Sequence, residues 1–310
     1  MSFHCPRCLR NFQGSEGRPG LYWRKLGTYY RSCDQKLIQR YQCLHCQKSF
    51  SSATFERPYR QRKRHLNPQV FEFLASGMSQ RRGHRLLRIN RKTLVRKMLF
   101  LARLAPLYLR EMHLQWPLVT HLEFDDLETF EHSKYKPLSV TVAVVHKRRW
   151  ILGFQVSQMP AKGLLAKRSR QKYGPRKDKR PQARARLFSE IREYLAPDAL
   201  ICSDQNPHYT ADVKKYFPEA THQTVKGKRG CVTGQGELKE GAYDPLFSLN
   251  HTCAMMRAQV NRLFRKTWNT TKKAERLALH LNLYVLFHNM DLLRKEKTID
   301  FPRFLQSTSI

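Results

Sequence analysis

The sequence predicts a mixed α/β protein that begins with a small metal-binding module. Runs of β-branched and aromatic residues predict strands, and longer segments with helical periodicity separate and follow them. Two Cys-x2-Cys pairs near the N-terminus predict a module whose fold depends on a metal ion. Of the 310 residues, 41% are hydrophobic and 11% are aromatic, which is enough to build folded cores.

The charge of the chain predicts a nucleic-acid partner. Its 58 Lys+Arg against 24 Asp+Glu give a formal net charge of +34, which repels other copies of the chain unless a polyanion neutralises it. No apolar run is long enough to span a membrane, and the first residues lack an apolar signal segment. We therefore expect a reducing compartment, the cytoplasm with its nucleoid, and neither a membrane nor a small-molecule substrate.

The N-terminal module, expected over residues 1–52, is predicted to be a zinc ribbon. A Cys-x2-Cys turn brings two thiolates to one ion, and two such turns complete a tetrahedral shell around a single structural Zn²⁺. Residues 21–23 and 27–30 are β-prone and can supply the strands of the ribbon. Cys33 and His45 are alternative ligands in reserve. The four predicted ligands are Cys5, Cys8, Cys43 and Cys46.

The next module, expected over residues 53–112, is predicted to contain a helix-turn-helix. A first helix starts at residues 67–68 and stops at Gly77, Ser79 caps a second, and Asn90 caps a third. The third helix turns Leu94, Met98 and other apolar residues to one side. A basic outer face suits the major groove of DNA, although a plain helical connector remains the alternative. The predicted DNA-facing residues are Arg91, Lys92, Thr93, Arg96 and Lys97.

The large C-terminal domain, expected over residues 113–300 and followed by a tail at 301–310, shows the element order β-β-β-α-β-α-β-α. Strands are expected at residues 119–124, 138–145 and 150–156, where short connections predict an antiparallel meander. A buried-type strand at 199–202 and a short one at 220–225 follow, with helices at about 182–194 and 207–216. Two long helices, at about 250–266 and 273–293, close the domain.

Two carboxylates are expected at strand ends. Asp125 directly follows the strand expected at 119–124, and Asp204 follows the strand expected at 199–202, with Ser203 between. Carboxylate oxygens are the ligands that Mg²⁺ prefers, and two such ions can activate a nucleophile and stabilise the leaving oxygen of a phosphodiester. An Asp at a strand end is also a common turn or cap residue. Asp126 is a candidate secondary ligand, with a solvated side chain as the alternative.

These features together resemble those of the bacterial insertion-sequence transposases of the DDE type, most similar to the family of the first-numbered insertion element. The zinc ribbon, the helix-turn-helix, Glu-Phe-Asp-Asp at 123–126, Ser-Asp at 203–204 and the basic segment 257–273 carry the resemblance over residues 1–295. It implies an RNase H-like fold, a mixed five-stranded sheet flanked by helices. It also implies that Asp125 and Asp204 are the first two ligands of Mg²⁺ or Mn²⁺ in a two-metal site.

The third ligand is where the chain departs from the family pattern. The family places a Glu seven residues before an arginine, and here Asn250 stands in that position before Arg257. An Asn carbonyl can coordinate Mg²⁺, but without charge. Glu237 or Glu240 can replace it, or the chain can bind DNA without cutting it. We take Asn250 first and Glu237 second.

Further basic residues are expected to face DNA, and binding should then weaken steeply with salt. The segment 162–186 is either a solvated loop or a loop that grips phosphates. Trp268, Tyr243 and Tyr209 are candidates for stacking on bases, with burial as the alternative. The basic candidates of the large domain are Lys167, Arg168, Arg170, Arg257, Arg262, Arg265 and Lys266.

The expected function is therefore an enzyme that binds the terminal inverted repeats of a mobile element, cleaves DNA strands and joins them to a target. Because two ends must be paired, a homodimer or larger assembly on double-stranded DNA is expected. One alternative is a catalytically inactive, transposase-derived DNA-binding protein. A second alternative is an RNase H-like nuclease without strand transfer.

Overall fold

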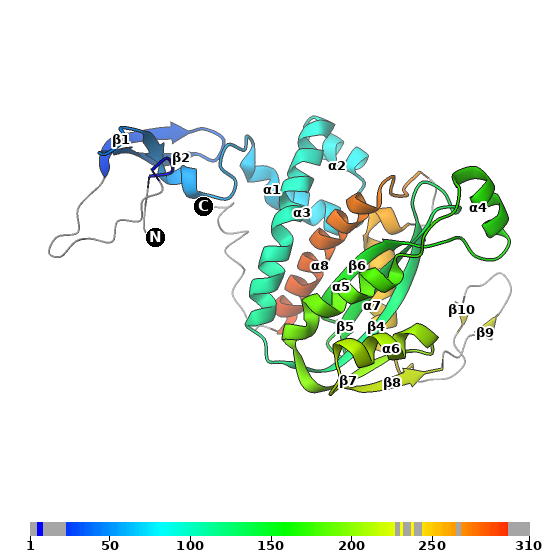
Figure 1. Cartoon of the computed structure of the whole chain (residues 1–310). Coiled ribbons are helices and arrows are strands. Elements are labelled where there is room, and N and C mark those ends of the chain that lie inside the picture. The colour runs from blue at the N-terminus through cyan, green and yellow to red at the C-terminus, as the bar shows by residue number, and fades with distance from the viewer. Residues whose placement is uncertain are drawn as a thin grey trace. The chain divides into compact units, whose positions relative to one another are not determined.

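The computed structural model describes residues 5–8, 23–226, 230–231, 237–238, 244–264 and 268–296 (Figure 1). These residues belong to two compact units, which divide between Pro68 and Gln69. The three-helix segment, predicted as part of a module at 53–112, shares the second unit with the sheet from Gln69 onward. The predicted tail at 301–310 lies outside the described residues. No described helix has the length and apolar character needed to cross a membrane.

The first unit contains an antiparallel three-stranded sheet, ordered β1-β2-β3. Its strands are β1 (Trp23–Arg31), β2 (Lys36–Cys43) and β3 (Ser49–Ser51), followed by 3-10 turns at Ser52–Phe55 and Arg64–Leu66. The β1–β2 register shifts between Lys25 and Thr28, where Gly27 has a φ of +92°. Such a backbone conformation favours glycine, and the extra residue forms a bulge. The buried cluster beside the cysteines is small: Tyr41, Cys43 and Phe50.

The predicted helix signals are confirmed in α1 (Asn67–Ala75), α2 (Gln80–Leu86) and α3 (Arg91–Leu114). Gly77 follows α1 with a φ of +81°. The Ser79 hydroxyl accepts a hydrogen bond from the Arg82 amide, and the Asn90 side chain accepts one from the Lys92 amide at 2.8 Å. These caps satisfy amide groups that have no partner inside their own helix.

Helices α1 and α3 pack against α8 (Ala274–Glu296), and α2 packs against α3, so the three helices do not form a free-standing module. Asn282 on α8 donates a hydrogen bond to the Ala102 carbonyl oxygen at 3.1 Å. The rings of Phe71 and Phe287 meet edge to face, with centroids 5.8 Å apart. The apolar side of α3 is therefore buried within the second unit, in agreement with its predicted periodicity at Leu94 and Met98.

The second unit is built on a mixed five-stranded sheet in the order β6-β5-β4-β7-β8 (Figure 1). The strands β4 (Val119–Phe130), β5 (Pro137–Val145) and β6 (Ile151–Gln158) are antiparallel, which confirms the predicted meander. The strands β7 (Leu195–Asp204) and β8 (Thr221–Val225) run parallel to β4. A separate pair, β9 (Gly230–Cys231) and β10 (Glu237–Leu238), is antiparallel.

Helices cover both faces of this sheet. Phe124 on β4 packs on Phe188 of α5 (Arg180–Ile191) and on Tyr209 of α6 (Pro207–Tyr216). The neighbouring Glu123 faces α7 (Phe247–Gln259), because successive strand residues point to opposite faces. Asn289 of α8 bonds both backbone groups of Ile151 at the start of β6. Along the chain, helix α4 (Leu165–Tyr173) lies between β6 and α5.

Three predicted boundaries differ from the structure. The strand expected to stop at residue 124 continues to Phe130, because its pairing with β5 extends to Phe130 and Pro137. The helix expected over 250–266 ends at Gln259, and a 3-10 turn follows at Asn261–Leu263. The segment 162–186, for which one reading was a disordered loop, contains α4 and the first half of α5.

Buried histidines should make the second unit sensitive to acid. Burial lowers the pKa of His280 to about 4, with Arg262 adding to the effect and the hydrogen bond to Leu74 opposing it. Between the unfolded value near 6.5 and 4, the unfolded chain binds the extra proton, so stability falls as the pH falls through this window. At pH 5 the expected loss from this residue is roughly 2 kcal/mol relative to pH 7.5.

Replacing His280 by Gln removes the titrating group and retains a donor for the Leu74 carbonyl, which lies 2.7 Å from Nε2 of His280. We expect His280→Gln to reduce the difference between unfolding free energies at pH 7.5 and pH 5 by roughly 2 kcal/mol. Urea unfolding at the two pH values measures this difference. His208→Gln, at an exposed histidine, is the control and should leave it unchanged. An unchanged difference in His280→Gln contradicts the assignment of acid sensitivity to this group.

Candidate functional site

The four predicted zinc ligands lie together in the first unit. Their sulfur atoms are all within 4.8 Å of one another, and the Sγ atoms of Cys5 and Cys46 are 3.5 Å apart. Four sulfurs at about 2.3 Å from one zinc ion are separated by about 3.8 Å in a tetrahedron, so the observed cluster has nearly the right size. The residues Cys5, Cys8, Cys43 and Cys46 can therefore hold a zinc ion.

The surrounding sheet fixes this cluster in place. The Cys43 amide donates to the Lys48 carbonyl at 3.0 Å, which closes the second Cys-x2-Cys turn. Trp23 packs against the Tyr41, Cys43 and Phe50 core that carries these cysteines. Hydrogen bonding to Cys46 is the largest cause that raises the pKa of Cys8 to about 12. Zinc binding would displace the protons that such thiols hold.

The two reserve ligands stand outside the group of four. His45 is exposed, and its Nδ1 is 3.8 Å from the sulfur of Cys8. Cys33 makes a hydrogen bond of 3.8 Å to the adjacent Asp34. Neither residue belongs to the cluster of four whose ligand atoms converge.

The two predicted catalytic carboxylates are brought together by the parallel pairing of β4 and β7. Glu123 is paired with Cys202, and continuing this register by two residues sets Asp125 beside Asp204. The two carboxylates also interact electrostatically. Burial is the largest cause that raises the pKa of Asp125 to about 7, and the charge of Asp204 is the next. Asp125 lies within β4 rather than after it, two residues beyond the last pair of the parallel ladder with β7.

Each carboxylate is oriented by its own hydrogen bonds. Asp125 accepts from the Tyr209 hydroxyl at 3.2 Å and from the Asp126 amide at 2.6 Å. Asp204 accepts from the Asn206 amide at 3.0 Å, just before α6 begins. Two like charges held close together in a partly buried place favour a bound cation or a shared proton. Oxygen atoms of this kind suit Mg²⁺ or Mn²⁺.

Helix α7 carries the third candidate ligand and packs against the same strand. The Leu249 amide donates to the buried Glu123 carboxylate at 2.8 Å. Four residues later, Cys253 senses the charge of Asp125, which together with the larger effect of burial raises the pKa of Cys253 to about 12. Asn250 lies between Leu249 and Cys253 on α7, the helix that packs against the strand bearing Asp125.

The structure adds Asp244, a residue that sequence reasoning missed. The Asn250 amide nitrogen donates to both carboxylate oxygens of Asp244, at 3.0 and 3.3 Å. Because the nitrogen is committed to Asp244, the carbonyl oxygen is the end of the amide that remains for a ligand. The sequence signal for this contact is an Asp six positions before the Asn, near the start of α7. Of the alternatives, Glu237 lies in β10, and Glu240 lies outside the described residues.

Asp126 belongs to the opposite face of the sheet, and the expectation of a solvated side chain is wrong. Its side chain is 9% exposed and lies 3.9 Å from the Arg184 guanidinium. The Thr141 hydroxyl donates to it. Arg184, which is 2% exposed, also donates to Asp212 at 2.6 Å and lies over the Tyr209 ring. The Arg184 guanidinium therefore holds the ring of Tyr209 in place. The spacing of these residues in the sequence does not predict this network.

On α3, Arg91, Lys92 and Arg96 are exposed as predicted, and Thr93 is half-buried. Lys97 is 4% exposed, so its expected place on the outer face is wrong. In an α-helix it stands three residues after Leu94, and this spacing puts it beside the buried side. It therefore does not present its ammonium group to a ligand on that face.

The other basic candidates divide in the same way. Lys167, Arg168 and Arg170 are exposed on α4. Arg262 lies beyond the end of α7 in a half-buried turn, where burial and the neighbouring Arg276 lower its pKa. Arg257 is half-buried near the end of α7, while Arg265 and Lys266 lie outside the described residues. Of the stacking candidates, Trp268 is exposed, Tyr209 is fully buried and Tyr243 is not described.

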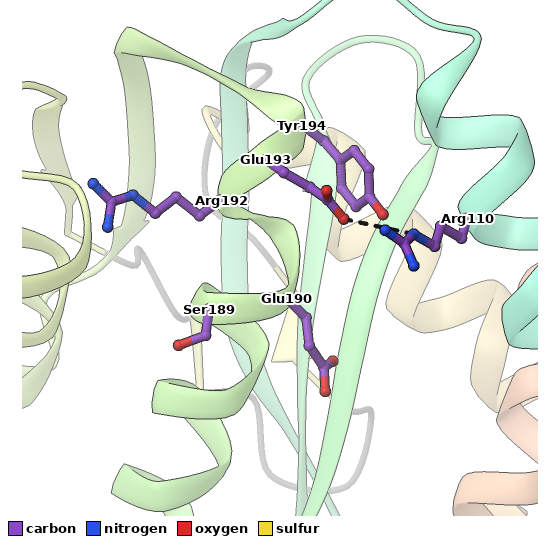
Figure 2. A pocket seen from close by; sticks show the side chains of 6 residues that line it. All are labelled: Arg110, Ser189, Glu190, Arg192, Glu193 and Tyr194. Carbon is purple, nitrogen blue, oxygen red and sulfur yellow. Dashed lines mark ion pairs between the residues drawn. The ribbon is translucent and has the colours of Figure 1, made fainter.

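One cavity, of about 730 Å³, is an open hollow away from the two carboxylates (Figure 2). Arg110 from α3 and Glu193 from the turn after α5 form an ion pair across it at 3.9 Å. Its acidic and basic side chains offset one another, so it offers no net charge to an anion or a metal. Its lining residues are Arg110, Ser189, Glu190, Arg192, Glu193 and Tyr194.

No protein-family model and no curated protein sequence matches this chain.

Proposed function

We propose that this protein is a DDE-type transposase, an enzyme that cleaves and joins DNA strands with the help of divalent metal ions. The observation that carries the proposal is the proximity of Asp125 and Asp204 on adjacent parallel strands, in a chain with a net charge of +34. Two close carboxylates repel each other, and in a strongly cationic protein a cation that they hold against a bound polyanion accounts for their being kept together.

The sheet supports the RNase H-like assignment. Its order, β6-β5-β4-β7-β8, with an antiparallel half and a parallel half that share β4, is a mixed five-stranded sheet with helices on both faces. The shared strand carries the first carboxylate, and its parallel neighbour carries the second. In parallel α/β sheets, ligands bind beyond the carboxyl ends of the strands, and Asp204 is the last residue of β7.

The residues divide the work of holding the ions and the DNA. Asp125, Asp204 and the Asn250 carbonyl would bind Mg²⁺ or Mn²⁺, with Asp244 holding the amide of Asn250 in one orientation. When bound, such ions activate the attacking oxygen and stabilise the leaving oxygen of a phosphodiester. Tyr209 keeps Asp125 turned toward the site through its hydroxyl. Exposed cations on α3 and α4 supply phosphate contacts.

The first unit and the outer face of α3 would recognise the ends of a mobile element. The cysteine-held sheet and the basic start of α3 are both compatible with DNA contact. Because two ends must be cut and joined, the active form is a homodimer or a larger assembly on double-stranded DNA. The site of action is the cytoplasm of a prokaryotic cell, where the nucleoid lies.

The test is a strand-transfer assay with the purified full chain, its encoding element's terminal repeats as labelled duplexes, and a supercoiled target plasmid. Nicked ends and joined products should appear with Mg²⁺ or Mn²⁺ and be absent when both ions are omitted from the buffer. Nicked products without joining indicate a nuclease of the same fold. Neither product, with DNA binding intact, contradicts the enzyme.

A second candidate, a DNA-binding protein without catalysis, is favoured by one observation. Asn250 carries no charge where the family has a carboxylate, which weakens a metal site by one negative ligand. Calorimetry with Mn²⁺ separates the two candidates. An active site gives saturable heat that Asp125→Ala removes, whereas the binding protein gives no such heat.

A further inference from the structure

A strongly basic segment forms a helix at one end of the five-stranded sheet. Residues 162–177 contain seven Lys and Arg and neither Asp nor Glu. Within this segment, α4 stands apart from the helices that cover the faces of the sheet (Figure 1). The side chains of Lys167, Arg168, Arg170 and Lys172 on α4 are all exposed. The segment therefore presents its positive charge on a formed helix rather than on an irregular loop.

The α4 segment is fixed to the hairpin that joins β4 to β5, residues 131–136. The buried Ser169 hydroxyl donates a hydrogen bond to the Tyr135 carbonyl oxygen at 2.7 Å. The Arg176 guanidinium lies 3.6 Å from the Glu131 carboxylate, and it donates to one carbonyl oxygen at the start of β5 and to one just after β6. Because these partners belong to the framework of the sheet, the position of α4 is set before any ligand binds.

The same hairpin contacts the stretch of chain that leads into α8. The His132 amide donates to the Thr271 carbonyl oxygen at 2.8 Å, and the two segments form a short parallel bridge. This contact brings the exposed Lys272 and Lys273 to the hairpin, whose own Lys134 is also exposed. We call these three joined segments the hairpin surface; its residues are 131–136, 162–177 and 270–273.

The charge of the hairpin surface is almost entirely positive. It contains two Lys in the hairpin, seven Lys and Arg in the α4 segment and two Lys before α8, eleven in all, against one carboxylate, Glu131. That carboxylate is already paired, with Lys136 at 3.7 Å and with Arg176 at 3.6 Å. The surface therefore has a large excess of cations that a polyanion can neutralise.

A hollow of about 440 Å³ lies between α4 and the loops on either side of it. Arg170 and Arg176 line it, and no carboxylate of the described residues does. Arg176 is held by its three partners in the hairpin and the sheet, so Arg170 is the group that can turn to an anion there. An arginine suits a phosphate in such a place, because its planar group offers paired donors.

The hairpin surface begins on the strand that carries the first proposed metal ligand. Six residues lead from Asp125 to Glu131, which is about 20 Å of extended chain. The surface is therefore separate from the proposed metal site and within reach of the same bound duplex. Because duplex DNA rises about 3.4 Å per base pair, 20 Å corresponds to about six base pairs.

We propose that the hairpin surface binds the phosphate backbone of duplex DNA about six base pairs from the phosphate at the two carboxylates, with α4 making most of the contacts. Charge complementarity selects this occupant, because duplex DNA carries about one negative charge per 1.7 Å of its axis. Contacts of this kind position a duplex without reading its sequence. The inference rests on the proposed function, in which either an element end or the target supplies the same backbone.

The test measures the salt dependence of DNA binding by the full chain and by the triple variant Lys167→Gln/Arg168→Gln/Arg170→Gln. Fluorescence anisotropy without divalent ions gives the dissociation constant of a labelled duplex over a series of salt concentrations. Each phosphate contact that is lost lowers the slope of log affinity against log salt by about 0.9. The variant should therefore lose about two to three units of this slope.

The matched control is Arg192→Gln/Lys214→Gln/Lys215→Gln. It removes the same number of charges from exposed sites after α5 and at the end of α6, where the chain returns toward the starts of β7 and β8. Its slope should change by less than about one unit. Both triple variants should unfold within about 2 °C of the parent, because every substituted side chain is exposed.

Hydroxyl-radical footprinting on a labelled element end distinguishes the two sources of duplex. If the surface holds the element end, the parent protects phosphates about six base pairs from the cleavage position, and the α4 variant loses that protection. If it holds the target, the α4 variant keeps the footprint on the element end and loses affinity for an unrelated duplex. Either pattern supports the proposal, and each assigns the surface to one source.

Three results would overturn the proposal. One is a parent-like slope in the α4 variant, and another is an equal loss of slope in both triple variants, which would reduce the effect to net charge. The third is a structured RNA that binds at least tenfold more tightly than the duplex and depends on the same three side chains. These results leave strand cleavage untouched, whereas a parent that binds no duplex at all contradicts the proposed function as well.

Discussion

Asp204→Asn should lower the rate of DNA strand cleavage by at least about 10³-fold and leave the affinity for DNA unchanged or slightly higher. The side chain sits at the end of β7, next to Asp125, and accepts the Asn206 amide. Asn has the same shape but lacks the charge that a divalent ion requires. Metal ions supply several kcal/mol of charge stabilisation to phosphoryl chemistry, and about 4 kcal/mol corresponds to 10³ in rate.

The measurement is the initial rate of nicking on labelled element ends, with the dissociation constant for the same DNA determined in parallel. Asp178→Asn is the control, because Asp178 is an exposed carboxylate already paired with Arg180. That variant should cleave at nearly the parent rate. Parent-like cleavage by Asp204→Asn removes the two-carboxylate site from the mechanism, since no other described residue occupies its place beside Asp125.

The Asn in the third position changes how such a site would work. In a three-carboxylate site, each ligand contributes a charge and a fixed direction. Here Asn250 would contribute only an oxygen, whose direction would be set by Asp244, which accepts both hydrogen bonds from the amide nitrogen. Mg²⁺ and Mn²⁺ carry the same charge and take the same oxygen ligands, so the loss of one negative ligand would weaken the binding of either ion.

Patterns that depend on local rules were readable from the sequence. Gly77, Ser79 and Asn90 end and begin helices for reasons contained in a few neighbouring residues. The cysteine spacing predicts the metal-binding cluster because two short turns already limit its geometry. The adjacency of Asp125 and Asp204 was implied by the resemblance to the DDE family, and the register of β4 and β7 agrees with it.

Features that depend on tertiary packing were not readable. The strand carrying Asp125 continues past the carboxylate because its ladder with β5 extends to Phe130 and Pro137, a length of pairing that sequence periodicity does not reveal. Lys97 is buried because α3 packs within the second unit, although its immediate neighbours are as basic as those of Arg96. Asp244 could not be predicted because its contact with Asn250 depends on where α7 starts. The segment 162–186 forms α4 despite its high positive charge.

Loss of the metal from the first unit should unfold that unit and leave the second folded. Among the described residues its core consists of five buried hydrophobic side chains, Ile38, Tyr41, Cys43, Phe50 and Ala53, which is too little apolar area to hold a domain of this size by itself. Structural zinc contributes about 10–16 kcal/mol at neutral pH, far more than such a domain would otherwise have. Cys43→Ser removes one of the four sulfur ligands and leaves a hydroxyl in an apolar place.

We therefore expect Cys43→Ser to lose its zinc and to be cut by trypsin between residues 23 and 66, while thermal unfolding of the α/β unit shifts by less than about 2 °C. Metal analysis and timed proteolysis measure the first two outcomes, and circular dichroism measures the third. Cys33→Ser is the matched control, because Cys33 lies outside the sulfur cluster. A zinc-free Cys43→Ser that resists trypsin as well as the parent would show that the sheet, and not the metal, holds this unit together.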